Sequence, residues 1–290
     1  MFKKTDIRNF YFENERGERI DCQDIDDDLF LLNVSGLGYE ESISYELIGN
    51  TFTETSRKMI QSNISGDLEF CENAYDIYKK FVDFIFGSKK LKLVYIPKLE
   101  NRVEFYKDID ITKIDKTEED EFNVLSVPIK MKATSLWYKK SDVIVSLAYH
   151  EDEIKWDFKW DSKFIDHDNQ NIIYNNKGHV DSPFQLEISG YIKNPSIIVY
   201  KDNQVYEKLT LNVEIKEFEK LMYSSKDGDL YIMKQNTDGT TENLFTNTYI
   251  NIEEENAIFK LPIGTSKIRI QAENDIMAAR LSIFEFYKAV

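Results

Sequence analysis

SNISGDLEFCENAYDIYKKFVDFIFGSKKLKLVYIP, residues 62–97, predicts a strand, a helix and a second strand in that order. In the first strand, Ile64 and Leu68 belong to the same period-two set as the preceding Ile60, which is typical of a half-buried strand. The second strand alternates Leu91, Leu93 and Tyr95 against Lys90, Lys92 and Val94.

The segment between these strands repeats apolar residues at helical spacing, and one face is predicted to carry Tyr75, Tyr78, Val82 and Ile85. Asn73 is the candidate N-cap. Gly87, followed by two lysines, marks the expected C-terminal end. We predict one helix here and strands almost everywhere else.

Strand patterns continue on both sides of this unit. The front half adds VEFYKDIDITKI (103–114) and FNVLSVPIKMKATSLWY (122–138). The back half has PFQLEISGY, PSIIVY, KLTLNVEI, DLYIMK, AIFKLPIG, SKIRIQAE and RLSIFEFY, separated by turn pairs such as Asp227-Gly228 and Asp238-Gly239. Many short strands without intervening helices predict a β-sandwich.

The length of 290 residues favours two domains. Beyond Tyr138 the sequence becomes polar and irregular, with scattered aromatic residues, so we place the boundary near residue 140. The predicted domains are 1–140 and 141–290. The fold class is mainly β: a front domain of sandwich or barrel type with one helix, and a back β-sandwich.

The net charge is −15, which disfavours binding to a nucleic-acid backbone or an anionic membrane. Two cysteines, Cys22 and Cys71, are too few for a disulfide framework and favour a reducing compartment during assembly. No run approaches the roughly 18 apolar residues of a membrane span, and no export signal is recognisable. We expect a soluble protein.

NVSGLGYEES, residues 33–42, spaces Gly36 and Gly38 as in a phosphate-binding loop. A dinucleotide fingerprint needs a third glycine three positions later, where this sequence has Glu41. Alternating apolar residues follow instead of a helix. The two glycines are therefore predicted to serve a turn or bulge between strands.

No residue set predicts catalysis or metal binding. The three histidines, His150, His167 and His179, lack the spacing of helical zinc ligands, and no nucleophile elbow accompanies them. Surface or hydrogen-bonding roles are favoured for them. We predict no catalytic residue, no metal and no cofactor.

The acidic run DCQDIDDDLF offers four carboxylates that could hold calcium, from Asp24, Asp26, Asp27 and Asp28. It lacks the central glycine and the terminal glutamate of a calcium loop, so a solvated turn is favoured. A carboxylate pair for glycoside hydrolysis stays open among the 52 acidic residues, because such pairing depends on spatial separation.

IKWDFKWDSKF, residues 154–164, sets Trp156, Phe158 and Trp160 on one side of a predicted strand. Such a row can be a buried face, a protein contact or a platform for sugar rings. Packing or a protein contact is favoured, and sugar stacking is the alternative.

Read in order, several segments resemble the siphophage distal tail protein family, the hub proteins between a long non-contractile tail tube and its tip. In the front half these are GLGYE (36–40), SNISGDLEF (62–70), AYDIYKKFVDFI (74–85), LKLVYIP (91–97), FYKDIDITKIDKTE (105–118) and SLWY (135–138). The back half adds NNKGHVDSPFQLEISGYIKNPSI (175–197), YSSKDGDLYI (223–232) and FKLPIGTSKIRI (259–270). Together they cover nearly the whole chain.

The resemblance implies a front domain that assembles into a ring, usually of six subunits, and a galectin-like back domain that projects outward. It implies a non-enzymatic hub at the virion tail tip, assembled in the bacterial host cytoplasm, through which DNA passes without being held. The implied partners are further copies of the chain, the tail tube protein, tail-associated fibre or lysin proteins, and receptor-binding or other baseplate proteins. Neither stable nucleic-acid binding nor membrane binding is expected.

Two other readings compete with the hub. The back sandwich could act as a carbohydrate-binding adhesion module through Trp156 and Trp160. An enzyme that degrades the cell wall is the least favoured, because no acid/base pair or metal site can be assigned.

Overall fold

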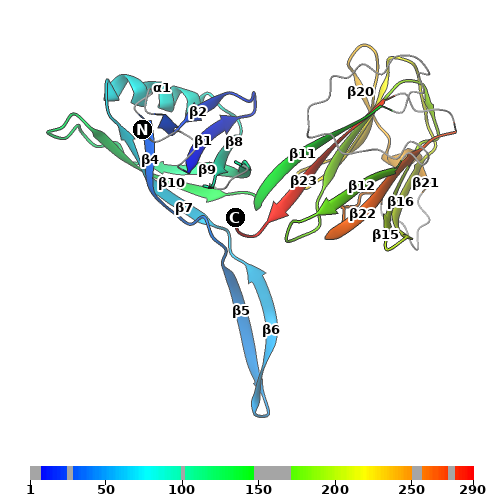
Figure 1. The fold of residues 1–290 in the computed structure, drawn as a ribbon, viewed down its shortest axis with the longest axis horizontal. Helices are drawn as coiled ribbons and strands as arrows, with labels where there is room; N and C mark the ends of the chain where they lie inside the picture. Colours follow the sequence, from blue (N-terminus) through cyan, green and yellow to red (C-terminus); the bar gives the residue numbers. More distant parts are fainter. Residues whose placement is uncertain (1–7, 25–28, 99–101, 147–170, 250–256, 274–277) are drawn as a thin grey trace. The chain divides into compact units, whose positions relative to one another are not determined.

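The computed structural model describes residues 8–24, 29–98, 102–146, 171–249, 257–273 and 278–290 (Figure 1). The described part is mainly β with one α-helix, which confirms the predicted fold class. Two compact units divide the chain: residues 1–139 with 287–290, and residues 140–286. The last four residues therefore belong to the first unit.

The first unit is built on one antiparallel sheet in the order β2-β1-β8-β9-β10-β7-β4-β3. Its strands are β1 (Asn9–Asn14), β2 (Arg19–Asp21), β3 (Gln23–Asp24), β4 (Leu29–Ser35), β7 (Asn63–Phe70), β8 (Leu91–Ile96), β9 (Phe105–Ile114) and β10 (Leu125–Ala133). Cys22 links the two ends, because its N–H donates to the Phe10 carbonyl and its own carbonyl accepts from the Leu31 N–H, each over 2.9 Å. The sheet thus curls back on itself like a barrel.

Helix α1 (Ala74–Phe86) lies against this sheet and buries Phe81 and Ile85 in its core. The ring of Phe81 meets Phe12 edge-on at 5.5 Å between centroids and Phe70 at 6.0 Å. Burial of one such side chain contributes about 1.5–3 kcal/mol. The helix is held by this apolar contact.

The helix prediction is right in place and partly wrong in detail. The buried stripe starts at Ala74, whereas Tyr75 is exposed and donates its hydroxyl to Glu118 over 2.6 Å. Asn73 precedes the helix with a φ of 49°, but its side chain makes no capping hydrogen bond. Its backbone carbonyl instead accepts from the N–H groups of Asp76 and Ile77. Gly87 ends the helix as predicted, donating its N–H to Asp83.

The two strands beside the helix form as predicted. In β7, Ile64 and Leu68 are buried. In β8, Val94 is buried as well as Leu93, so the expected half-exposed alternation is wrong there. Val94 lies between the cross-strand neighbours Tyr11 of β1 and Tyr106 of β9, so two large aromatic side chains flank it on the face opposite to Leu93.

The second unit holds two antiparallel sheets and a short strand pair. One sheet has the order β20-β19-β18-β13-β23-β11 and the other β12-β22-β15-β16-β21. The strands of the first are β11 (Trp137–Ser146), β13 (Phe184–Ser189), β18 (Lys220–Lys226), β19 (Asp229–Gln235), β20 (Thr241–Asn243) and β23 (Ala278–Tyr287). Those of the second are β12 (Asn171–Asn176), β15 (Ser196–Lys201), β16 (Gln204–Leu211), β21 (Thr248–Tyr249) and β22 (Gly264–Gln271). The remaining elements are β14 (Ile192–Lys193), β17 (Glu214–Ile215) and the 3-10 helix η2 (Phe245–Asn247).

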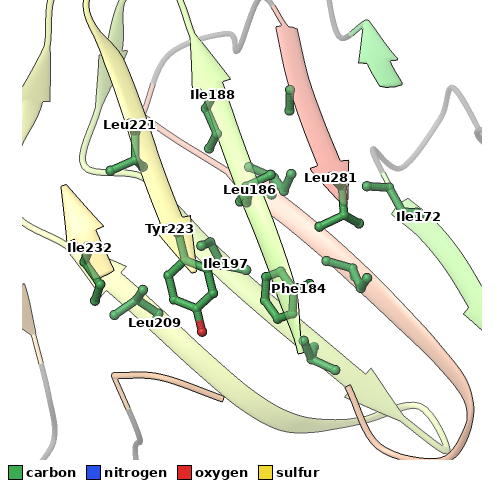
Figure 2. Packing of buried hydrophobic residues seen from close by; sticks show 14 of the residues in the cluster. Ile172, Phe184, Leu186, Ile188, Ile197, Leu209, Leu221, Tyr223, Ile232 and Leu281 are labelled. Carbon is green, nitrogen blue, oxygen red and sulfur yellow. The ribbon is translucent and has the colours of Figure 1, made fainter. Parts of the chain in front are cut away.

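Apolar side chains from both sheets of the second unit meet in one core, as Figure 2 shows. Phe184 and Tyr223 stack at 5.0 Å between ring centroids. The buried Tyr223 hydroxyl accepts from the Phe259 N–H over 3.0 Å, so this polar group is satisfied. The unit is a β-sandwich, as the strand pattern predicts.

Candidate assembly interface

A long hairpin projects from the first unit (Figure 1). Strands β5 (Glu41–Ile48) and β6 (Thr51–Met59) pair only with each other and form a separate two-stranded sheet. Gly49 and Asn50 make the two-residue turn, and Gly49 has a φ of 63°. A positive φ at the first turn position suits glycine, because glycine lacks a Cβ.

The strand register sorts the side chains of the hairpin into two faces. Paired residues share a face, so one face carries the apolar residues Ile43, Tyr45, Leu47, Phe52 and Met59, together with the charged Glu41, Glu54 and Arg57. We call these five apolar residues the hairpin patch. The opposite face is mostly polar and carries Ser42, Ser44, Glu46, Ile48, Thr51, Thr53, Ser56 and Lys58.

The hairpin patch has little cover within the described residues. Phe52 is 70% exposed, and Tyr45 and Leu47 are also exposed. An isolated hairpin is marginally stable in water, and its two outer strand edges present unpaired backbone groups. Contiguous exposed apolar surface of this kind marks an interaction site. The hairpin therefore has the chemistry of a contact that another molecule completes.

Arg57 fixes the register of the hairpin from within the patch face. Its guanidinium contacts Glu41 at 2.7 Å on the opposite strand and Glu54 at 2.7 Å on its own strand. The hydrogen bonds from Arg57 lower the pKa of Glu54. All three groups are partly exposed, so we assign them a positioning role more than a stabilising one.

The base of the hairpin requires glycine at position 36. Gly36 has a φ of 80°, and an added Cβ would lie 1.9 Å from the Asn63 carbonyl oxygen. β4 also changes register against β7 between Leu32 and Ser35, just before this glycine. The predicted turn or bulge at Gly36 is confirmed, and the residues that follow are strand instead of a nucleotide-binding helix.

Both arms of the hairpin are tied to the curled sheet at their base. On the first arm, Trp137 donates its indole N–H to the Leu37 carbonyl over 2.9 Å. On the second, Gln61 donates its amide to the Ala133 carbonyl over 2.8 Å, and the Ala133 N–H donates to the Ser62 carbonyl over 3.0 Å. These hydrogen bonds hold both strands of the hairpin at their base and so limit the orientations that the hairpin can adopt.

Lys107 of β9 lies buried between these two ties. Its ammonium group is 4.8 Å from the ring centroid of Trp137 and 3.5 Å from the Ser62 hydroxyl. Burial lowers the pKa of Lys107 to about 8. A lysine in this environment loses much of its preference for the charged form.

The C-terminal segment adds a third tie. Lys288 lies 3.3 Å from the Tyr39 hydroxyl, 5.0 Å from the centroid of the same ring and 3.5 Å from Glu41. Tyr287 packs edge-on against Phe105 at 5.4 Å between centroids. The end of the chain thus supports the first arm of the hairpin.

Several predicted site residues lie outside the described residues: Trp156, Phe158 and Trp160, His150 and His167, and Asp26, Asp27 and Asp28. The sugar-stacking alternative therefore stays a prediction.

His179 is described, and its backbone N–H donates to the Phe286 carbonyl over 2.7 Å. Asp24 lies in β3. Within the described ranges, no three His, Cys, Asp or Glu side chains gather as metal ligands, and no helix is long and apolar enough to cross a membrane.

The hairpin patch was not predicted from the sequence as a functional surface. The alternation of Ile43, Tyr45 and Leu47 was visible, but alternation alone does not distinguish a covered face from an open one. A usable signal lies in the second strand, TFTETSRKM (51–59), where only Phe52 and Met59 are apolar. A strand with so few apolar residues contributes little to a core of its own.

One family model matches the front of the chain. Residues 9–134 match the family model of the distal tail protein, N-terminal domain. None of the curated proteins matches the chain.

Solved structures of low sequence identity share the fold. A chain from the phage P2 baseplate, in its activated conformation with Ca, has a TM-score of 0.65 at 15% identity and covers 98% of this chain and 100% of its own. The Dit protein of phage SPP1, described as a paradigm of the hub adsorption apparatus in phages infecting Gram-positive bacteria, has a TM-score of 0.57 at 9% identity, with coverages of 95% and 98%. The match over residues 9–134 confirms the resemblance of the front-half motifs in that range to the distal tail protein family.

Proposed function

We propose that this chain is a structural hub at the tip of a long non-contractile phage tail. Copies of its first unit close into a six-membered ring that joins the tail tube to the proteins of the tip or baseplate. The observation that carries the proposal is the hairpin patch, a set of apolar side chains on one face of the hairpin with little cover among the described residues, whose base is hydrogen-bonded to the curled sheet. Ring closure by identical copies supplies a partner for every such face.

The net charge of −15 suits a conduit for DNA. An acidic ring repels a polyanion and so lets it pass without holding it. The protein needs neither stable nucleic-acid binding nor membrane binding for this role. Its assembly takes place in the host cytoplasm, and its final location is the tail tip of the virion.

The role we propose is non-enzymatic and needs no cofactor. The second unit, a β-sandwich that we infer to be galectin-like, serves as an outward platform for fibre, lysin, receptor-binding or other baseplate proteins. A sandwich fold alone carries no sugar-binding function, since function depends on a particular site.

Negative-stain microscopy of the purified chain, alone and with its tail tube protein, tests the ring. We expect annular particles with six-fold symmetry. A chain that stays monomeric at high concentration and forms no ring with the tube protein contradicts the proposal.

A paired set of hairpin variants tests which face closes the ring. Leu47→Ser combined with Phe52→Ser removes the centre of the hairpin patch, and we expect ring assembly to be lost while the melting temperature of the monomer is unchanged. Ile48→Ser is the matched control, because Ile48 is 61% exposed at the same tip but on the opposite face. Equal loss of rings in the control would contradict an interface formed by the patch.

A further inference from the structure

The outer face of one sheet in the second unit has an unusual charge pattern. Core residues such as Ile197, Val199 and Ile268 point inward from the sheet β12-β22-β15-β16-β21, so their sequence neighbours face outward. One outward row across four strands is Ile173, Lys267, Tyr200 and Val205. The next row holds Arg269, Ile198 and Lys208. We call these seven residues the basic face.

No carboxylate belongs to the basic face. Uncharged residues occupy the other described outward positions on these strands, which are Asn175, Ser196, Thr210, Thr265 and Gln271, so no carboxylate lies there either. This is notable in a chain with 52 acidic residues and a net charge of −15. Among the described residues, Lys208, Lys267 and Arg269 have no ion-pair partner, and the buried Nε of Arg269 has no hydrogen-bond partner.

The outer face of the opposite sheet is different. There Lys220 contacts Glu187 at 2.7 Å, and Arg280 and Lys140 each contact Asp142 at 3.4 Å. These three cations are paired with carboxylates within the unit. The excess positive charge is therefore a local property of the basic face.

The basic face also presents apolar surface. Ile173 is 60% exposed, Val205 is exposed, and the Tyr200 ring lies 5.9 Å from the Lys267 ammonium. Ile198 faces outward but is only 6% exposed, as expected where the aliphatic parts of its cross-strand neighbours Arg269 and Lys208 cover it. Tyr, Arg and aliphatic groups side by side are the composition of protein interfaces.

We propose that the basic face docks an acidic surface of a different protein of the tail tip, with carboxylates set around an apolar centre. The inference rests on the proposed function and names the chemistry of a partner of the second unit. Face-to-face contact between two copies is disfavoured, because it would oppose like charges. Nucleic acid is disfavoured by the exposed aliphatic groups and by the net charge of the chain.

Chemical footprinting of the lysines provides the first test. Tails are purified through a tag on this chain, and acetylation rates of Lys208 and Lys267 are compared between tails and the isolated chain. We expect both lysines to be protected in tails. Carbodiimide activates a carboxylate, and the amine of a contacting lysine then displaces the urea and forms an amide, so we expect this reagent to link the two lysines to a different tail-tip protein.

Charge-reversal variants provide the second test. Lys267→Glu with Arg269→Glu is expected to weaken retention of the cross-linked protein at least about a hundredfold, since like charges then face each other. Lys177→Glu with Lys216→Glu is the matched control, because both lysines are exposed in the same unit and the change in net charge is equal. The control is expected to retain the partner.

The outcomes separate this inference from the proposed function. Tails that contain the chain but leave Lys208 and Lys267 as reactive as in the isolated chain would overturn the inference alone. Cross-links only within the chain or between its copies, or protection that nuclease treatment removes, would also overturn it. A tag on this chain that recovers the chain without tails contradicts the proposed function and the inference together.

Discussion

The indole N–H of Trp137 donates a hydrogen bond of 2.9 Å to the carbonyl oxygen of Leu37, one hundred positions earlier in the chain. Leu37 lies in the connection that leads into the projecting hairpin, and Trp137 is fully buried in the core of the first unit. The bond thus joins the base of the exposed hairpin to the buried core of the first unit. The hairpin patch lies outside the core, so this hydrogen bond lets the packing of the core set the orientation of the patch.

Replacement of Trp137 by Phe tests this link. The variant keeps an aromatic ring but leaves the Leu37 carbonyl without its donor, which costs about 1–3 kcal/mol where the group stays buried. We expect a lower urea midpoint and faster amide exchange across residues 37–48. Tyr138→Phe serves as the control, because Tyr138 follows Trp137 in β11. This variant removes a hydroxyl that is hydrogen-bonded to Asp108 of β9 and leaves the hairpin base intact. Equal acceleration of exchange in both variants would contradict a specific role for Trp137.

Replacement of Gly36 by Ala is expected to disrupt the hairpin base. The added methyl would approach the Asn63 carbonyl oxygen to 1.9 Å at a φ of 80°, so the backbone must move. Gly17 has a similar φ of 77° with nothing within 4 Å of an added Cβ, so Gly17→Ala isolates the conformational cost. We expect that control to lose about 1 kcal/mol and Gly36→Ala to lose clearly more, measured by chemical denaturation. Equal losses would show that the contact with Asn63 relaxes freely.

The sequence was sufficient for the parts of the fold that follow from local patterns. The helix at 74–86, the buried Ile64 and Leu68 beside it, and the turn at Gly36 all follow from periodicity and glycine chemistry. The change in composition beyond Tyr138 predicts a domain boundary near residue 140, and the division into domains 1–140 and 141–290 stays a prediction. No local sequence pattern predicts that Tyr287 belongs to the first unit, because this depends on how distant segments of the chain pack.

The sequence was insufficient where exposure depends on tertiary contacts. Tyr75 and Phe81 are both apolar residues of one helix, and only the surrounding sheet decides that Phe81 is buried. The basic face shows the same limit. Lys208 and Lys267 are 59 positions apart and lie in adjacent rows of one sheet face only because β15 pairs with both β16 and β22. Pairing between distant strands is not encoded in any short window.

Truncation of Phe81 is expected to destabilise the first unit strongly. Phe81 packs against Phe12 and Phe70, so Phe81→Ala leaves a cavity between the helix and the sheet and should cost about 3–5 kcal/mol. Phe86 ends the same helix and is 78% exposed, so Phe86→Ala is the matched control and should change stability by less than about 0.5 kcal/mol. Denaturant unfolding of the two variants checks the difference. A large loss for Phe86→Ala would indicate a contact made outside the described residues.

Lys107 predicts a pH dependence of stability. Its pKa is about 8 in the folded chain against an ordinary value of 10.5, so between these values the unfolded chain binds more protons than the folded one. Stability should therefore rise with pH across this window, whereas at lower pH the folded chain bears the cost of a buried ammonium group. The full effect is about 3–4 kcal/mol, because the two pKa values differ by about 2.5 and each pKa unit corresponds to roughly 1.4 kcal/mol.

The variant Lys107→Met isolates this contribution, because it keeps the aliphatic stem of the side chain without the charge. We expect the variant to be more stable than the parent chain at pH 7 and the difference to shrink toward pH 10, measured as the change in unfolding free energy between the two chains. Subtraction of the two curves cancels the tyrosines, including Tyr106, whose pKa is raised to about 12 by burial and by its bond to Glu104. A difference that stays constant from pH 7 to pH 10 would mean that Lys107 titrates at its ordinary value and that the ammonium group finds enough stabilisation from the Trp137 ring and Ser62.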